Sequence, residues 1–521
     1  MRFTIERKNR IDWLWSLGLV TLGVVSRLPF VSHILYHWDS INFALAIRRY
    51  DITHHQPQPP GYILYVLLAR GINTLVANPQ WTLVGMSILG GILAAVILYL
   101  LGRDLFDRTA GVVAALFLLF CPLFWFYSEI AMPYIIDGLA TIALAWLFNR
   151  AEQLKRSFLP AAVLLGVVGG FRQQTMVFMA PLAVYAMRKA SIKQMVLGAS
   201  TAVIVFLGSF IPMIGLSGGW QAYRQAVSGL TGSFFTQTSV LMGGGLRGLA
   251  HDVASWGSST AYALGPIGVI LFIWAVWKIR EFPALLQDRR AWFLAMWILP
   301  SLTFYTFIHM GSHGLVFTYI PAVFLISAKA SCDLVKAVQE RWRARLWTTV
   351  MGGILLADVL MFVVLSNKPL AGMDFKIVNW ATIRANDRFF STRFQLIQDH
   401  FDPGSSVILA STWRHLQYYL PQYYVLSSPC GSSELTLETS DVVYAYGREY
   451  NTLQQGDLNG TLPASSQIVI FFDNTAECFL TGFSTTRIQT LSLEGENVYY
   501  LRLDADETLA FNGSALVIHG K

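Results

Sequence analysis

Long uninterrupted runs of apolar residues constrain this chain more than any other feature. A helix of about 20 apolar residues is long enough to cross the hydrocarbon core of a bilayer. Runs of this kind recur along the chain, and charged residues make up only 13% of it, whereas soluble domains carry about a quarter. We therefore expect a polytopic α-helical membrane protein with about eleven transmembrane helices. The expected spans are 11–30, 80–102, 109–127, 132–150, 157–171, 173–187, 193–216, 258–279, 290–308, 314–335 and 345–366.

The distribution of lysine and arginine predicts how these helices are oriented. With the N-terminus in the cytoplasm, the inner connections carry 20 of these residues and the outer connections up to residue 368 carry 7. Cytoplasmic loops of membrane proteins are enriched in lysine and arginine in this way. The first apolar run is long and lacks a small-residue cleavage site, so we interpret it as a membrane helix rather than a removed signal peptide. An odd number of crossings then places the C-terminus outside.

The C-terminal part of the chain changes character at about residue 369. It carries 9 Lys and Arg against 16 Asp and Glu, and its runs SSVILAS, DVVYAYG, SQIVIFFD and NVYYLRLD are short and β-rich, which is typical of strands bounded by turns. The segment TWRHLQYYLP between two of these runs is a candidate helix. We therefore predict two domains, a transmembrane domain over 1–368 and a small extracytoplasmic α/β domain over 369–521. Cys430 and Cys478 lie in the second domain, where they either form a disulfide or stay free thiols.

Ionisable residues concentrate on the expected outer side, beginning in the first loop. The stretch YHWDSINFALAIRRYDITHHQPQPPGY, residues 36–62, holds two acids, three histidines and two arginines. The overlapping segment 60–77 is apolar but carries Arg70, so we expect it to lie at the membrane interface rather than to span the membrane. Charged groups at membrane depth are costly and usually face a cavity or each other, which predicts a shared site at the outer rim. Its candidate members are Arg27, Asp39, His54, His55, Glu129, Asp137, Arg172, His309 and His313.

Acids and cations gathered in this way suit one kind of chemistry. A carboxylate can remove the proton of a hydroxyl nucleophile, while arginine and histidine can hold a departing phosphate, arginine through forked hydrogen bonds. Together these groups describe the transfer of a group from a phosphate to an alcohol. A site on the outer face is out of reach of cytoplasmic nucleotide donors, so the donor is expected to arrive attached to a lipid.

Several motifs, in their order along the chain, resemble one family of membrane enzymes. They are HWDS around Asp39, the run from His55 to Tyr65 that contains PQPPGYILY, and the later stretches FWFYSEIAMPY, GGFRQQTMVFMAPL and HMGSHGLVFTYIPAVFLI. These are similar to motifs of GT-C glycosyltransferases, in particular the bacterial branch of the protein-mannosyltransferase and aminoarabinose-transferase superfamily. The resemblance covers roughly residues 10–370 and does not extend to the C-terminal domain.

The resemblance implies a GT-C-like bundle with interfacial helices in the first outer loop, and an inverting glycosyltransferase. Asp39 would be the base that takes the proton of the acceptor hydroxyl. The donor would be a polyprenyl-phosphate sugar, undecaprenyl phosphate in a bacterium, and the acceptor a hydroxyl of a glycan, a lipid-linked saccharide or a protein. The protein would lie in the bacterial inner membrane. The resemblance gives neither the sugar nor the acceptor.

The same resemblance suggests further site residues. It implies that Arg172 together with His54 or His55 would hold the phosphate. Glu129 and Asp137, which lie near the outer ends of the expected helices, are further candidate acids of the catalytic site. The remaining candidate substrate-binding residues are Tyr62, His309, His313 and Arg27. The chain departs from the family at two points. Family members often have Asp-Glu where this chain has Asp39-Ser40, and the lysine that some members carry after a proline pair is replaced here by Gly61 and Tyr62.

Other interpretations of the same residues stay open. Asp39 is also a suitable cap for a helix that begins at DSINFALAI, and Asp137 could pair with Arg27 to hold the bundle together. No cofactor is required, although Asp39, Glu129 and Asp137 are oxygen ligands of the kind that bind a divalent cation, and no spacing predicts a metal site. At the level of function, the alternatives are a transporter or lipid flippase and a non-catalytic assembly subunit that binds cell-wall glycan.

Overall fold

The computed structural model consists of two compact units, which are described separately. It describes residues 2–285, 287–365, 377–427, 444–445, 448–449, 467–473, 487–505, 507–512 and 515–520. The helical unit contains residues 1–32 and 59–383, and the sheet unit contains residues 33–58 and 384–521. The loop 33–58 is therefore connected at both ends to residues of the helical unit, but its own residues belong to the sheet unit.

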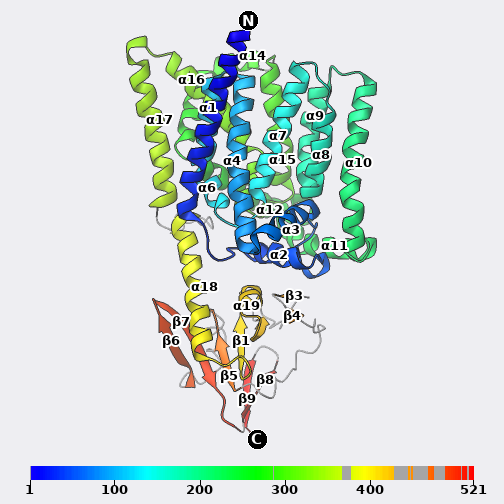
Figure 1. The fold of residues 1–521 in the computed structure, drawn as a ribbon, viewed down its shortest axis with the longest axis vertical. Helices are drawn as coiled ribbons and strands as arrows, with labels where there is room; N and C mark the ends of the chain where they lie inside the picture. The colour runs from blue at the N-terminus through cyan, green and yellow to red at the C-terminus, as the bar shows by residue number, and fades with distance from the viewer. Residues whose placement is uncertain are drawn as a thin grey trace. The chain divides into compact units, whose positions relative to one another are not determined.

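The helical unit is a bundle of apolar helices, and Figure 1 shows its long helices side by side with α10 and α17 at opposite edges. Its longer helices are α1 (Arg2–Arg27), α4 (Pro79–Leu105), α7 (Tyr134–Gln153), α10 (Ile192–Leu216), α11 (Trp220–Thr238), α12 (Gly245–Leu264), α15 (Arg289–Phe307), α16 (Ile320–Lys336) and α17 (Glu340–Val363). Its shorter helices are α3 (Ile63–Val76), α5 (Arg108–Phe120), α6 (Pro122–Ser128), α8 (Leu159–Phe171), α9 (Gln173–Met187), α13 (Ile267–Trp277) and α14 (Phe282–Leu285).

Four helices in the described part of the chain are long and apolar enough to cross a membrane, and six spans result if each of two bent helix pairs counts as one. The four are α1, α4, α10 and α17. The expected span 109–127 is divided at Pro122 into α5 and α6, which are bent by 63°. Helix α3 has 14 residues, fewer than the roughly 20 that a span requires. The protein is thus an integral membrane protein, and the full count of eleven spans stays a prediction.

The prediction of one helix over 258–279 is wrong. Helix α12 ends at Leu264 and α13 starts at Ile267, with a bend of 99° between them. Gly265 lies at the break with φ +48° and ψ −133°, a backbone conformation that is open essentially to glycine alone. Pro266 follows as the N-cap of α13. The local reason for the break is therefore a glycine-proline pair within an otherwise apolar run.

Small residues allow the helices of the bundle to approach closely. A Cβ added to Gly111 of α5 would lie 2.5 Å from the carbonyl oxygen of Tyr99 on α4, so only glycine fits at this crossing. The neighbouring apolar core joins α1, α4 and α5 through Leu19, Ala95, Tyr99, Ala115 and Leu119. Helix association in membranes depends on this kind of close packing, because lipid tails are as apolar as the side chains.

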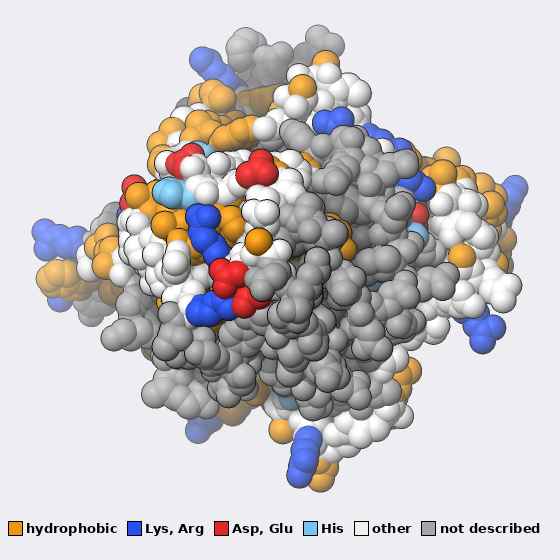
Figure 2. Space-filling model, turned by 90° about the horizontal axis from the view of Figure 1, so that it is seen from below, with side chains coloured by type: hydrophobic (Ala, Val, Ile, Leu, Met, Phe, Trp, Pro, Cys, Tyr) orange, Lys and Arg blue, Asp and Glu red, His pale blue; other side chains and the backbone are white. Residues whose placement is uncertain are grey.

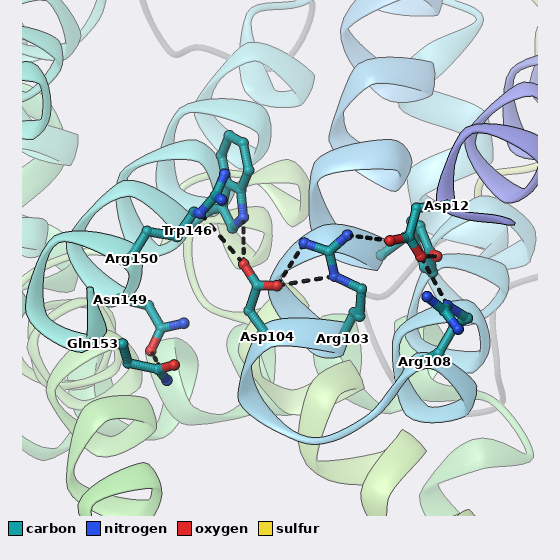
Figure 3. Close-up of polar contacts among 9 residues, drawn as sticks. Asp12, Arg103, Asp104, Arg108, Trp146, Asn149, Arg150 and Gln153 are labelled. Carbon is teal, nitrogen blue, oxygen red and sulfur yellow. Dashed lines mark hydrogen bonds and ion pairs between the residues drawn. The ribbon is translucent and has the colours of Figure 1, made fainter. Parts of the chain in front are cut away.

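A network of charges joins α1 to the ends of α4, α5 and α7 (Figure 3). Asp12 of α1 accepts hydrogen bonds from Arg103 Nη1 and Arg108 Nε, both at 2.8 Å. Asp104 in turn pairs with Arg103 at 2.6 Å and with Arg150 of α7 at 3.7 Å. Three arginines that the sequence assigns to inner connections thus belong to one polar network, and each has an acidic partner.

The sheet unit contains a mixed five-stranded sheet, which confirms the predicted α/β character of the C-terminal region. The strand order is β2-β1-β5-β7-β6, with parallel pairing from β2 to β5 and antiparallel pairing from β5 to β6. Its strands are β1 (Ser406–Ala410), β2 (Tyr424–Ser427), β5 (Ile468–Phe471), β6 (Gln489–Leu493) and β7 (Glu496–Arg502). Two short two-stranded sheets accompany it, formed by β3 (Tyr444–Ala445) with β4 (Arg448–Glu449) and by β8 (Glu507–Asn512) with β9 (Ala515–Gly520).

The four predicted β-rich runs each contain a strand, and the candidate helix TWRHLQYYLP forms α19 (Trp413–Tyr419). Helix α18 (Trp380–His400) precedes the sheet, and α2 (Trp38–Arg48) comes from the first loop. Ion pairs join Arg487 to Glu507 and Arg393 to Glu496, and Figure 2 shows acidic and basic side chains next to each other on the face seen from below.

Two sequence predictions fall on parts of the chain that are not described. The predicted domain boundary at 368/369 lies between the described residues 365 and 377, while the compact units assign the loop 33–58 to the sheet unit. Cys430 and Cys478 also lie outside the described residues. Cys121 and Cys332, in the helical unit, are buried free thiols.

Candidate active site

The loop 33–58 carries Asp39 in the first turn of α2. The N-cap of this helix is His37, whose Nδ1 accepts a hydrogen bond from the Asp39 amide at 3.1 Å, while Ser40 Oγ accepts from the His37 amide at 3.3 Å. The alternative interpretation of Asp39 as the helix cap is therefore wrong, because the capping box uses His37 and Ser40. The Asp39 carboxylate lies 3.8 Å from His37 Nδ1, and its side chain is 26% exposed.

The two histidines of the loop follow α2 in a tight turn. His54 Nδ1 lies 3.0 Å from Asp51 Oδ2, and the backbones of Asp51 and Gln56 exchange two hydrogen bonds that close the turn. His55 has a positive φ of 54°. Burial acts to raise the pKa of Asp51, but hydrogen bonds from His54 and Thr53 outweigh it, so this pKa lies below its usual value. Asp51 is therefore an anion at neutral pH and a ready partner for His54.

In the helical unit, Asp137 and Arg172 form a buried ion pair. Arg172 Nη1 lies 2.6 Å from Asp137 Oδ2, and Thr175 Oγ1 donates a hydrogen bond to Asp137 Oδ1 at 3.0 Å. The guanidinium group also lies over the rings of Tyr62 and Tyr134, at 5.9 and 5.6 Å from their centroids. The suggested pairing of Asp137 with Arg27 is therefore wrong. Three side chains, those of Asp137, Tyr62 and Tyr134, contact the Arg172 guanidinium.

Arg172 reaches this position because the chain breaks between α8 and α9. Its backbone is extended, with φ −157° and ψ 113°, and serves both as C-cap of α8 and N-cap of α9. The stretch GGFRQQ thus directs the arginine into the bundle. Tyr62 enters from the other side on a left-handed residue, φ 47°, that precedes α3. The signal for Tyr134, which sequence reasoning missed, lies only in its place at the start of α7, three residues before Asp137.

Arg27 pairs with Glu129, another acid that the sequence proposed for the site. Arg27 Nε lies 3.9 Å from Glu129 Oε1, and both side chains are almost fully buried. Arg27 Nη2 also donates to the carbonyl of Leu119 at 2.5 Å, and the guanidinium lies 4.8 Å from the ring centre of Trp125. Burial raises the pKa of Glu129 to about 8, although Arg27 acts to lower it. These contacts tie the end of α1 to the helices that follow it.

His309 and His313 lie in the connection between α15 and α16, each beside a hydroxyl group. His309 Nδ1 is 2.8 Å from Thr238 Oγ1, and His313 Nδ1 is 2.8 Å from Ser259 Oγ. Burial lowers the pKa of both histidines, so both are neutral at pH 7. They can take part in hydrogen bonds with a polar ligand, but they contribute no positive charge toward a phosphate.

The candidate residues thus form several separate contacts rather than a single described cluster. Asp39, His54 and His55 belong to the sheet unit, whereas the other seven candidates belong to the helical unit. Within the described part of the chain, no group of three or more His, Cys, Asp or Glu side chains is arranged to hold a metal ion. Sequence reasoning also missed Trp38, Trp413 and Arg414, which contact one another in the sheet unit.

Comparison with known proteins finds a family match over part of the chain and solved structures with a similar fold. Residues 57–215 match the family model described as dolichyl-phosphate-mannose-protein mannosyltransferase. No curated protein sequence matches the chain. The segment matched by the family model includes Tyr62, Glu129, Asp137 and Arg172.

Solved structures share the fold at low sequence identity. The structure of ArnT from Cupriavidus metallidurans bound to undecaprenyl phosphate is 12% identical, with a TM-score of 0.56, over 93% of this chain and 97% of that chain. The apo structure of the same protein gives a TM-score of 0.52 at 12% identity and the same coverage. The oligosaccharyltransferase AglB from Archaeoglobus fulgidus, in complex with an inhibitory peptide and a dolichol-phosphate, gives 0.50 at 13% identity over 90% of this chain and 70% of that chain. Residues 57–215 thus match a mannosyltransferase family model, and the chain shares the fold of ArnT.

Proposed function

We propose that this protein is an inverting glycosyltransferase that moves a sugar from a polyprenyl phosphate to a hydroxyl of a glycan, lipid-linked or protein acceptor. The observation that carries the proposal is the match of residues 57–215 to the mannosyltransferase family, on a fold shared with ArnT over nearly the whole chain. The ArnT structure holds undecaprenyl phosphate, and a donor of the same chemical class suits the buried arginine described above.

In the proposed reaction, Asp39 removes the proton of the acceptor hydroxyl, and the resulting oxygen attacks the anomeric carbon of the donor. The bond from this carbon to the phosphate oxygen breaks, and the polyprenyl phosphate leaves with the electron pair. Arg172 holds the leaving phosphate, because an arginine fork matches phosphate oxygens. Asp137 and Thr175 keep Arg172 in place, and Tyr62 lies against it. His54 or His55 is the second phosphate ligand.

The remaining candidates take supporting roles in this proposal. His309 and His313 are uncharged, so they are suited to hydrogen bonds with sugar hydroxyls. Arg27 and Glu129 hold the bundle, since each is buried against the other. For the whole protein we propose eleven spans, a cytoplasmic N-terminus and an extracytoplasmic C-terminal region in a bacterial inner membrane. The supporting observation is the excess of lysine and arginine in alternate connections.

One feature favours the alternative of a transporter or flippase. The pairs α5–α6 and α12–α13 are broken helices, and discontinuous helices form the binding sites of many transporters. A transporter needs no general base, whereas a glycosyltransferase does. The two functions therefore differ in how they respond to the loss of the Asp39 charge.

The test replaces Asp39 by Asn in the full-length protein. A general base contributes about 10²–10⁴-fold to the rate, so we expect D39N to lower kcat by about that factor with a panel of polyprenyl-phosphate sugars. In cells, the glycolipid and glycan profile of a D39N strain should match that of a deletion strain. Binding of undecaprenyl phosphate should persist, because the carboxylate does not hold the phosphate.

The matched control is Asp399→Asn. Asp399 is exposed on α18, and its side chain makes no hydrogen bond or ion pair with the described residues, so this variant should keep the wild-type rate. Wild-type turnover by D39N would exclude Asp39 as the base. Lipid translocation that persists in D39N, without any sugar transfer by the wild type, would establish the flippase instead.

A further inference from the structure

Helix α19 of the sheet unit binds the same loop that carries Asp39. Arg414 of this helix is fully buried, and its Nη2 donates hydrogen bonds to the carbonyls of His54 at 2.7 Å and His55 at 3.2 Å. An arginine side chain carries five N–H donors in a rigid plane. These two hydrogen bonds therefore fix the orientation of the turn after α2 as well as its position against α19. The C-terminal end of the loop is thereby fixed to α19.

The start of the loop is held by the neighbouring residues of the same unit. His415 Nε2 donates to the carbonyl of Leu35 at 2.9 Å, and the Leu35 amide donates to Tyr419 Oη at 2.9 Å. Both backbone groups of Leu35 are therefore bound by α19. On α18, the Asp387 carboxylate accepts from the amides of His33 and Ile34 at 2.8 and 3.1 Å. The two ends of the loop thus have separate attachments.

The contact closest to Asp39 is aromatic. Trp38, its immediate neighbour, packs edge-to-face against Trp413, with ring centroids 5.0 Å apart and planes at 83°. The Arg414 guanidinium carbon lies 5.3 Å from the Trp38 ring and 5.4 Å from the Trp413 ring. Cation–π contacts are strongest with tryptophan and increase when the cation is desolvated. One buried arginine therefore contacts both the residue before Asp39 and the turn that follows α2.

Helix α19 is itself fixed to the sheet. Asp473, just after β5, accepts hydrogen bonds from the amides of Ser411 and Thr412 at 3.2 and 2.9 Å and from their hydroxyls at 2.7 and 3.0 Å. These residues connect β1 to α19. The attachments therefore continue from the loop, through a short helix, to the ends of two buried parallel strands.

We propose that Arg414 and Trp413 are positioning residues that fix Asp39 for proton transfer, so that the C-terminal region is a working part of the catalytic machinery. The inference rests on the proposed function, because it takes Asp39 as the base. A base acts only within hydrogen-bond reach of its proton, and a displacement of about 1 Å can cost about 10²-fold in rate. Arg414 and Trp413 touch neither donor nor acceptor in this scheme and act through Trp38 and the loop backbone.

The test compares Arg414→Lys with the matched control Arg487→Lys in the full-length protein. Lysine keeps the charge at 414 but lacks the planar fork and the same stacking on tryptophan. We expect R414K to lower kcat by about 10–100-fold, to raise the KM of the polyprenyl-phosphate donor through the turn that carries His54 and His55, and to move the acid limb of the kcat–pH profile. Arg487 pairs with Glu507 in the same unit, away from the loop, so R487K should leave all three quantities unchanged.

Amide hydrogen exchange tests the same contact without reference to catalysis. In R414K, the amides of residues 33–58 should exchange at least tenfold faster, while those of the buried core of α4 keep their wild-type rates. Trp413→Phe, which retains an aromatic face, should restore most of the activity that Trp413→Ala loses. If R414K gives too little folded protein to measure, the comparison of W413F with W413A tests the positioning role instead.

The outcomes separate this inference from the proposed function. Inactivity of D39N together with wild-type kcat in R414K and W413A would overturn the positioning role alone. Wild-type turnover in D39N would exclude Asp39 as the base and with it the positioning role. Absence of sugar transfer by the wild-type protein would overturn the proposed function, whatever the exchange rates. A lower yield of R414K and W413A with unchanged kcat per folded molecule would reduce Arg414 and Trp413 to a purely structural role and would also overturn the inference.

Discussion

Asp137 carries a carboxylate that is buried within an apolar helix bundle. A lone charge in this position would be costly, but Arg172 and Thr175 satisfy both of its oxygens. Removal of one partner from a buried pair leaves the other charge uncompensated, which costs more than the pair contributes to stability. Substitution of Asp137 or Arg172 should therefore lower the stability of the protein, whether or not either residue acts in catalysis.

Substitution of Asp137 by Ala should strongly destabilise the protein. It leaves the Arg172 guanidinium buried without its carboxylate, a loss of about 3–5 kcal/mol for pairs of this kind. Thr175→Val removes only one neutral donor and should cost about 1–2 kcal/mol. Thermal unfolding in detergent, followed by tryptophan fluorescence, measures both. Equal and small shifts of Tm in the two variants would contradict the assignment of a tight buried ion pair.

At the scale of elements, the breaks in the helices matter as much as the helices. Pro122 starts α6 after a 63° bend, and Gly265 separates α12 from α13 at a 99° bend. A Cβ at Gly265 would lie 2.9 Å from Asp358 Oδ1 on α17. The bend is therefore enforced both by a backbone conformation that excludes side chains and by an adjacent helix that leaves no space for one.

Gly265→Ala should destabilise the bundle by about 1–3 kcal/mol, the cost of a non-glycine residue in this backbone region, and the contact with Asp358 adds to it. Gly268 lies three residues away on α13, where an added Cβ would meet Leu264 at an ordinary 3.6 Å. Gly268→Ala should be neutral or stabilising by up to about 1 kcal/mol, because alanine favours helix. A Tm comparison of the two variants checks the bend, and a G265A protein as stable as G268A would argue against it.

The elements themselves were largely predictable from local sequence, and the contacts between them were not. Apolar runs indicated the helices, GGFRQQ indicated the division between α8 and α9, and the four β-rich runs indicated strands. The break at 265 was missed because apolar composition dominates that window. The sequence leaves the partner of Asp137 open because Arg27 and Arg172 both suit it chemically. Only the packing of the bundle selects Arg172.

At the scale of the whole molecule, the chain order and the compact units do not coincide. Residues 33–58 lie early in the sequence, yet they pack with residues 384–521. The hydrogen bonds responsible join positions about 350–380 residues apart, such as Leu35 with His415 and His54 with Arg414. No local sequence pattern indicates a contact over such a distance, which is why the sequence does not predict that this loop packs with the C-terminal region.

The stability of the sheet unit should depend on pH through His415. This imidazole is buried, bonded to Leu35 and stacked on Phe390 with ring centroids 4.4 Å apart, and burial lowers its pKa to about 4. The folded state thus favours the neutral form. The buried neutral imidazole therefore contributes to the free energy of unfolding of the sheet unit. This contribution is complete at pH values above about 6.5, the pKa of histidine in the unfolded state. It is lost as the pH falls toward 4, which lowers the free energy of unfolding by on the order of 3 kcal/mol.

Hydrogen exchange of residues 33–58 and of α19 at several pH values between 4 and 7 measures this dependence. His415→Gln keeps a donor for Leu35 but does not titrate, so its exchange rates, corrected for intrinsic chemistry, should change less over this window. The same pH dependence in H415Q and wild type would assign the effect to another group.

The joining of the first loop to the last part of the chain also affects biogenesis. A ribosome makes residues 33–58 long before it makes α18, α19 and the strands that receive them, so the loop must wait, without its partners, while the intervening helices enter the bilayer. A polypeptide interrupted between residues 384 and 412 would contain the whole helical unit and still leave Trp38 and Leu35 without their contacts to Trp413 and His415. The contacts that hold the first loop against α18 and α19 therefore form only after these two helices have been made.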